Sequence, residues 1–380
     1  MDFNLSEEQV AIQDSLRRYL AKDYGFEQRR AIAKSDDGFS RAAWSTYAEL
    51  GLLALPFSEA NGGLGGNAVD TMIVMETLGS HLALEPYLAT VVVAGSLIAD
   101  IGTDAQRDRL LGGITGGTLI AALAHQEPGA RYNRAHVGTT ARREADGFVL
   151  NGHKAVVVGA PGADQLLVSA RTSGAGADAQ GVTLFLVDPK AAGVTLTAYA
   201  TQDAQRAAEV KLVNVKVGAD AVIGPVDGAL PAIERAIDRG IAGLCAEAVG
   251  IMVALNAATL EYLKTRKQFG VPIGKFQALQ HRMADMAIAT EQSRSLATLA
   301  ALKADSEDAA ERSRAVSGAK AYIGQAARTV GQGAVQMHGG MGVTDELIVA
   351  HFFKRLTLIN ATFGDADHHL ARFSDTLLAE

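Results

Sequence analysis

The residues with the clearest chemical potential lie near the C-terminus, in the segment NATFGDADHH at positions 360–369. Carboxylates and imidazoles can bind a metal ion or exchange protons, so Asp365, Asp367, His368 and His369 are candidates for either chemistry. Adjacent histidines on a helix point about 100° apart, however, and so do not converge on one ion. The segment therefore favours a polar helix start without a metal, with Asp365 beside the free N–H groups of the first turn.

The bulk composition is that of a globular protein with an acidic balance. Hydrophobic residues make up 48% of the 380 positions, charged residues make up 20%, and the formal net charge is −7. With a pI near 5.8, the chain is a poor non-specific ligand for nucleic acid or for acidic membranes, although local Arg and Lys side chains can still bind an anion. The length allows two or three hydrophobic cores.

The sequence shows no recognisable targeting or membrane segment. The start, MDFNLSEEQ, lacks the basic and apolar regions of a signal peptide, and the apolar stretch Tyr87–Ala99 is shorter than the ~20 residues of a membrane helix. The single cysteine, Cys245, cannot form an internal disulfide and is interpreted as a small core residue rather than a catalytic thiol. We expect a cytoplasmic protein that binds neither nucleic acid nor a membrane.

Helical patterns dominate residues 1–118. Ser6 and Gln9 have the spacing of a capping box, and apolar residues then recur at helical intervals. The glycine-rich stretch at 58–68 is not flanked by the strand and helix of a phosphate-binding loop, so we interpret it as a surface turn.

The period changes to short β-branched runs at residues 119–226, where Asp146-Gly147 and Asn151-Gly152 predict tight turns. Helices do not alternate with these runs, which favours an antiparallel sheet over a parallel one. Long helical stripes return at residues 227–380 and predict a bundle. The expected fold is α+β and multidomain: an N-terminal helical domain (1–118), a central antiparallel, barrel-like β domain (119–226) and a C-terminal four-helix bundle (227–380).

Three short motifs resemble those of the acyl-CoA dehydrogenase family. They are TRKQFGVPIGKFQALQHRMADM (265–286), AVQMHGGMGV (334–343) and HQEPG (125–129), the last resembling the family's Thr-Glu-Pro-Gly turn. The order of helices, β domain and helical bundle is also similar to that family, so the resemblance covers essentially the whole chain.

The resemblance implies a tetrameric flavoprotein oxidoreductase that acts on CH–CH groups. In the family, FAD lies between the β domain and the bundle of one subunit, and a neighbouring bundle completes its site. A carboxylate removes the α proton of an acyl-CoA thioester while the β hydride passes to the flavin. The electrons then pass to an electron-transfer flavoprotein, in fatty acid or dicarboxylic acid degradation.

The part of the flavin site that one subunit donates to its neighbour is present. An Arg, an aromatic residue and a Gln of the first motif reach the neighbour's FAD in the family, and a Gln and two Gly residues of the second motif lie at its adenosine and pyrophosphate end. An Arg suits a pyrophosphate because its planar fork makes paired hydrogen bonds. The matching residues here are Arg266, Phe269, Gln277, Gln336, Gly339 and Gly340.

The part that a subunit uses for its own flavin is altered. Gln126 replaces the Thr that holds the flavin ring, and it can still donate or accept a hydrogen bond. The family continues Ala-Gly-Ser-Asp after Glu-Pro-Gly, where residues 130–133 read Ala-Arg-Tyr-Asn. The family's Trp-Ile-Thr strand beside the ring corresponds to Val156-Val157-Val158, without the aromatic ring or the hydroxyl.

The catalytic base of the family has no match at its two usual positions, which are Phe363 and Gly240 here. Asp365 and Asp367 lie just beyond the first position. Glu247 lies two helical turns after Gly240 on a similar helix face, where a buried carboxyl could act as a base or serve only internal bonding. The family's Arg near the CoA adenine corresponds to Ile241.

Three hypotheses follow from this combination. The chain is the base-lacking subunit of a heterotetramer and contributes to a homologous partner's FAD site, or a homo-oligomeric acyl-CoA dehydrogenase with Glu247 as a displaced base. The third hypothesis is a catalytically silent acyl-CoA-binding scaffold. The stretch DTMIVMETLGSHLALEPYLAT (70–90) and the Phe-Gly-Asp at 363–365 resemble the small subunits of pimeloyl-CoA dehydrogenases, which favours the first hypothesis.

Overall fold

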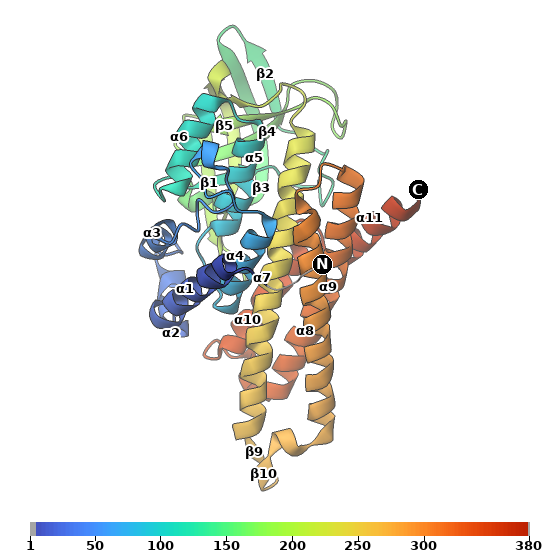
Figure 1. The fold of residues 1–380 in the computed structure, drawn as a ribbon. Helices are drawn as coiled ribbons and strands as arrows, with labels where there is room; N and C mark the ends of the chain where they lie inside the picture. The colour runs from blue at the N-terminus through green and yellow to red at the C-terminus, as the bar shows by residue number, and fades with distance from the viewer. Residues whose placement is uncertain (1–4, 379–380) are drawn as a thin grey trace. The chain divides into compact units, whose positions relative to one another are not determined.

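The computed structural model describes residues 5–378, and Figure 1 shows its ribbon. Six α-helices precede the sheet in the described chain. The predicted capping box is confirmed: the Ser6 hydroxyl accepts the N–H of Gln9, and the Gln9 side chain accepts the N–H of Ser6. The glycine-rich stretch forms turns, as predicted, with Gly62 and Gly65 at positive φ. The six helices are α1 (Glu7–Asp23), α2 (Phe26–Lys34), α3 (Arg41–Glu49), α4 (Ala68–Ser80), α5 (Ser96–Ile101) and α6 (Asp104–Thr115).

The β domain is an eight-stranded sheet within the described residues, with the order β6-β7-β3-β2-β4-β5-β8 and β1 beside β4. The pairs of β4 with β1 and with β2 are parallel, and the other pairs are antiparallel, as predicted for most of the sheet. The strands are β1 (Ala121–Ala124), β2 (Thr140–Glu144), β3 (Gly147–Val158), β4 (Gln165–Arg171), β5 (Val182–Val187), β6 (Val194–Ala200), β7 (Arg206–Gly218) and β8 (Val222–Ile223).

One of the two predicted tight turns is wrong. The chain does turn at Asp146, between β2 and β3, but Asn151 and Gly152 lie inside β3. They lie opposite a bulge in β7, where Val213 and Asn214 together face Asn151 between the pairs Leu150–Val215 and Gly152–Leu212. A Cβ on Gly152 would lie 2.3 Å from the Thr139 hydroxyl oxygen, so this glycine permits a close approach to a neighbouring segment rather than a turn.

The C-terminal part of the chain is the predicted helical bundle. Helices α8 and α9 pack side by side, and α9 also contacts α10 and α11. The bundle helices are α7 (Leu230–Thr265), α8 (Gln277–Ala304), α9 (Ala309–His338), α10 (Ile348–Ala361) and α11 (Ala366–Leu378). Among the described residues, α7 is the one helix long and apolar enough to cross a membrane, but 72% of its apolar window is buried inside the protein, as in the core helix of a bundle.

The chain forms two compact units that differ from the three predicted domains. One unit contains the residues up to Ala31, Ala68–Ala83 and the residues from Ile241 onward, so that α1 and α4 join the bundle. The other contains Ile32–Asn67 and Leu84–Gly240, which include the whole sheet. The predicted donated residues lie in the first unit, and the predicted flavin wall lies in the second.

Candidate active site

The first segment predicted to be donated is a tight hairpin at the end of α7. Strands β9 (Lys267–Gln268) and β10 (Val271–Pro272) pair antiparallel, and the Ile273 N–H donates to the Arg266 carbonyl oxygen at 2.9 Å. Phe269 and Gly270 form the turn with φ of 53° and 82°. A positive φ is costly for an aromatic residue, yet the Phe269 side chain is 91% exposed. The hairpin therefore presents an aromatic ring outward from its unit.

The second segment predicted to be donated follows α9 in the same unit. Gly339 ends the helix with φ of 60°, and a Cβ on Gly339 or Gly340 would meet no atom within 4 Å. The backbone is thus open to close approach by a phosphate group. All six residues predicted to be donated are exposed: Arg266, Phe269, Gln277, Gln336, Gly339 and Gly340. A cation, an aromatic ring, two amides and an open glycine backbone fit the pyrophosphate end of FAD.

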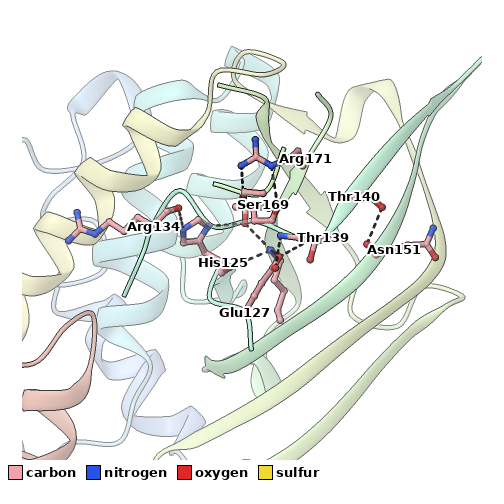
Figure 2. A network of polar contacts seen from close by, with 12 residues as sticks. His125, Glu127, Arg134, Thr139, Thr140, Asn151, Ser169 and Arg171 are labelled. Atoms are coloured by element: carbon pink, nitrogen blue, oxygen red, sulfur yellow. Dashed lines mark hydrogen bonds and ion pairs between the residues drawn. The ribbon is translucent and has the colours of Figure 1, made fainter. Parts of the chain in front are cut away.

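The HQEPG turn follows β1 in the other unit, and its side chains alternate in direction. Gln126 is exposed, and its carbonyl oxygen accepts the N–H of Ala155 on β3 at 2.8 Å. Glu127 is buried, and its carboxylate accepts the N–H groups of Gly138 and Thr139 at 2.6 and 2.9 Å. Figure 2 shows Glu127 beside Thr139. The turn therefore presents Gln126 outward while its neighbour anchors it to the sheet.

A buried lysine completes this anchor. Lys154, on β3, is fully buried, and its ammonium donates to Glu127 at 2.6 Å and to the Ser169 hydroxyl at 3.1 Å. Burial lowers the pKa of Lys154 to about 8, although Glu127 opposes the shift. Burial alone raises the pKa of Glu127, but Lys154 and Thr139 together outweigh it and lower the pKa to about 2. Both groups are therefore charged at neutral pH.

His125 extends the network on the other side. Burial and the nearby Lys154 ammonium lower its pKa to about 3, so the imidazole is neutral. A carbonyl oxygen only accepts, so His125 Nε2 carries the proton and donates to the Arg134 carbonyl at 2.9 Å. Its Nδ1 then accepts from the Ser169 hydroxyl at 2.8 Å. Figure 2 shows this ring between Arg134 and Ser169.

The segment after the HQEPG turn, whose residues 131–133 depart from the family pattern, forms consecutive turns. Arg131 has a positive φ of 49° and an exposed side chain. Buried Arg171, on β4, donates to the carbonyl oxygens of Ala135 and Val137 at 3.0 and 3.1 Å and so fixes the end of this segment. Sequence reasoning selected Gln126 but missed Lys154 and Arg171, because their partners are distant in the sequence.

The predicted flavin wall on β3 contains a bulge, because Ala155 and Val156 face a single residue of β7. Val156 has φ of 52°, an outlier for a β-branched residue, and its side chain is 45% exposed, whereas Val157 is buried. The Val156 N–H donates to Glu209 Oε1 at 3.3 Å, and the Tyr199 hydroxyl donates to the same oxygen at 3.0 Å. His153 Nε2 lies 2.7 Å from the other oxygen of Glu209. The exposed group at this bulge is an isopropyl, with no ring and no hydroxyl.

The first position for the base lies in a strained turn between α10 and α11. Phe363 has φ of 59° and Gly364 has φ of 122°. The ammonium of buried Lys320, on α9, donates to the Asn360 and Gly364 carbonyl oxygens at 2.9 and 2.6 Å. His369 Nε2 donates to the Phe363 carbonyl at 3.1 Å. Hydrogen bonds therefore hold the turn firmly, but the Phe363 side chain at the base position cannot accept a proton.

The carboxylates near the two base positions have other partners. Asp365 accepts the N–H of His368 at 2.9 Å, which confirms the predicted polar helix start of α11. The second position, Gly240, is buried inside α7. Beside it, Asp238 is buried and pairs with Arg134 at 2.8 Å. Glu247 is buried, and both of its oxygens accept hydrogen bonds from Arg355, at 2.6 and 2.7 Å.

The single cysteine lies in the core of the bundle unit. Cys245 is fully buried, and burial raises the pKa of its thiol to about 12, which confirms the core interpretation. Within residues 5–378, no three His, Cys, Asp or Glu side chains gather in a way that could hold a metal ion.

Fold and motifs define a flavin-dependent dehydrogenase, and comparison with protein families gives the same class. The N-terminal, middle and C-terminal domain models of acyl-CoA dehydrogenase match residues 6–118, 122–216 and 228–378. The chain belongs to the acyl-CoA dehydrogenase family, whose members are FAD-dependent oxidoreductases that act on CH–CH groups.

Individual relatives resemble the chain over nearly its whole length. The acyl-CoA dehydrogenase FadE12 of Mycobacterium tuberculosis is 31% identical over 350 residues, which cover 91% of this chain and 89% of the relative. The CarC subunit of the caffeyl-CoA reductase-Etf complex of Acetobacterium woodii is 28% identical over 360 residues, covering 92% of each chain. A chain of the ChsE4-ChsE5 complex of Mycobacterium tuberculosis superposes with a TM-score of 0.90, at 27% identity and full coverage of both chains.

Proposed function

We propose that this chain is the base-lacking subunit of a hetero-oligomeric acyl-CoA dehydrogenase and that it completes the FAD site of a homologous partner. The observation that carries the proposal is a contrast within the chain. All six donated positions are exposed and chemically suited to FAD, whereas the two base positions hold Phe363 and Gly240. The partner would supply the carboxylate and most of the flavin pocket.

The donated residues would bind and orient the cofactor. Arg266 would form paired hydrogen bonds with the pyrophosphate, and the backbone at Gly339 and Gly340 would approach the same group closely. Phe269 would pack against the cofactor or the partner wall, where burying its ring offsets the strain of a positive φ. Bound FAD supplies the acceptor for the hydride that leaves the β carbon of the acyl-CoA.

The chain's own flavin wall supports the same assignment. At the bulge on β3, Val156 presents an isopropyl group where the family has an aromatic ring, and Val158 lacks the hydroxyl that would bind the flavin ring. Arg131 and Tyr132 add bulk after the HQEPG turn. We therefore propose that this subunit holds little or no flavin on its own β domain.

The assembly and the electron acceptor follow from related proteins. One structural neighbour is part of a two-chain ChsE4-ChsE5 complex, and one relative is a subunit of a complex with Etf. We propose a cytoplasmic hetero-oligomer that takes an acyl-CoA substrate and passes electrons to an electron-transfer flavoprotein. The net charge of −7 opposes a role on nucleic acid or acidic membranes.

A homo-oligomer with Glu247 as the base is the competing hypothesis, and the ion pair of Glu247 argues against it. A carboxylate that holds two hydrogen bonds from a buried guanidinium would have to give up that pair to take a proton. Of the two carboxylates just beyond the first base position, Asp365 caps the first turn of α11, and Asp367 is exposed on that helix.

The test removes the carboxylate together with the guanidinium that pairs with it. The double variant Glu247→Met with Arg355→Met, in the co-purified oligomer, should retain flavin bleaching by acyl-CoA under anaerobic conditions. A Glu→Gln change at the base of the partner should abolish bleaching. Loss of bleaching in the Glu247→Met, Arg355→Met oligomer, with flavin content unchanged, would instead identify Glu247 as the base and overturn the proposal.

A further inference from the structure

Two aromatic side chains connect the donated segments to each other. Tyr262 lies in the last turn of α7, four residues before Arg266, and His338 is the last residue of α9, directly before Gly339. Their rings stack, with centroids 4.3 Å apart and an interplanar angle of 29°. The contact therefore joins the ends of two helices from which the two donated segments begin.

The orientation of the His338 ring is fixed by its own helix. Its Nδ1 lies 2.8 Å from the Ala334 carbonyl oxygen, one turn earlier on α9. Since the carbonyl can only accept, Nδ1 carries the proton and donates. The residue is 4% exposed, and burial lowers the pKa of the imidazole, so the ring is neutral at neutral pH. A neutral, oriented ring presents its face to Tyr262.

Tyr262 is bonded to the first segment through its backbone. Its carbonyl oxygen accepts the N–H of Arg266 at 2.8 Å, and the Arg266 carbonyl accepts the N–H of Ile273 at 2.9 Å. The hairpin that carries Phe269 therefore closes onto the helix turn that carries Tyr262. The Tyr262 hydroxyl also approaches the His338 carbonyl oxygen, but at 3.5 Å this bond is weak.

We infer that Tyr262 and His338 are positioning residues that hold Arg266 and the Gly339–Gly340 backbone in register, so that both reach one pyrophosphate group. The inference deepens the proposed function and rests on it. Neither residue needs to touch the cofactor. A bidentate contact and a close backbone approach both require placement within a fraction of an ångström, which two independent loops do not provide.

The test measures FAD affinity in the purified flavin-loaded oligomer by the fluorescence of released flavin. Tyr262→Leu removes the stacked ring and should weaken FAD binding about tenfold, the upper range expected for one aromatic pair. Tyr262→Phe keeps the ring and should stay within about twofold of the unchanged protein. The matched control is Tyr322→Leu, another half-buried tyrosine of the same bundle, on α9, which bonds Gln292 and should leave FAD affinity unchanged.

Size-exclusion profiles and the melting temperature of the apo oligomer separate positioning from general damage. The inference requires that Tyr262→Leu weakens FAD binding while both of these readouts match those of Tyr322→Leu. Equal losses for Tyr262→Leu and Tyr262→Phe would overturn it, as would unchanged affinity in Tyr262→Leu.

The FAD affinity of Arg266→Gln, measured in parallel, tests the donated site separately from the positioning role of Tyr262. If Arg266→Gln weakens FAD binding and Tyr262→Leu does not, the positioning role fails while the donated site stands. If Arg266→Gln also leaves the affinity unchanged, the donation itself fails, and the positioning role fails with it.

Discussion

Glu247 on α7 and Arg355 on α10 form a buried ion pair joined by two hydrogen bonds. Arg355 Nε lies 2.6 Å from Glu247 Oε1, and an Arg355 Nη lies 2.7 Å from Glu247 Oε2. The two side chains are 6% and 8% exposed. The pair lies inside the bundle unit and connects two helices that are distant in the sequence. It gives Glu247 the internal bonding role that the sequence analysis set beside a role as base.

Removing one partner of this pair should destabilise the bundle strongly. Glu247→Gln removes the negative charge that accepts two hydrogen bonds from the buried Arg355 guanidinium, and breaking such a buried pair costs about 3–5 kcal/mol. We expect a clear fall in the denaturation midpoint of Glu247→Gln, and a smaller one in the double variant with Met at positions 247 and 355. Glu261→Gln, at an exposed site on the same helix, is the control. Equal stability of Glu247→Gln and Glu261→Gln would contradict the structural role.

A close crossing of α4 and α7 predicts a second effect. A Cβ on Gly79 would lie 2.3 Å from the Glu247 carbonyl oxygen, and a Cβ on Gly250 would lie 1.9 Å from the Glu76 carbonyl oxygen. Each glycine therefore permits the backbone of the other helix to approach. Alanine at either position should lower the melting temperature, since overpacking costs about 1–3 kcal/mol.

The control for this crossing is another helical glycine. A Cβ on Gly112 in α6 would meet nothing within 4 Å, so Gly112→Ala should keep or raise the melting temperature by restricting the unfolded chain. The crossing would be refuted if Gly79→Ala and Gly112→Ala behaved alike.

Acid should destabilise the fold through its buried histidines. Burial, with Lys320 close by, lowers the pKa of His369 to about 3, and burial lowers the pKa of His125 to a similar value. These rings stay neutral in the folded chain but take up protons below pH 6.5 in the unfolded chain. Their contribution to stability is therefore fully present above pH 6.5 and is lost as the pH falls toward 3, by up to about 1.4 kcal/mol per pH unit for each ring.

The measurement is the melting temperature between pH 7.5 and 5. His369→Gln should flatten the decline relative to the unchanged protein, while His281→Gln, at an exposed position on α8, should not. Parallel curves for all three proteins would show that His369 does not carry the dependence.

Local patterns in the sequence predicted the features that depend on neighbouring residues. The capping box of Ser6 and Gln9, the helix start at Asp365 and the long bundle helices each follow from residues within one or two turns. The turn expected at Asn151-Gly152 failed because both residues pair with neighbouring strands inside β3. A dipeptide signal carries no information about such a neighbour.

The site was only partly predictable for the same reason. Motif matching selected residues by position in the sequence, such as Gln126 and Arg266. It did not find Lys154, which pairs with Glu127 across 27 residues, or Arg355, which pairs with Glu247 across 108 residues. Buried pairs of this kind depend on how elements pack together, so a single sequence gives no spacing rule for them.

The central claim is that this chain contributes residues to a partner's flavin site and does not form a catalytically active flavin site of its own. The most direct test is the flavin-to-polypeptide ratio of the chain purified alone, followed by anaerobic addition of acyl-CoA compounds. We predict far less than one flavin per chain and no bleaching, with flavin retained after co-expression with a homologous chain that carries the base. Near one flavin per chain, bleached by an acyl-CoA, would contradict the account.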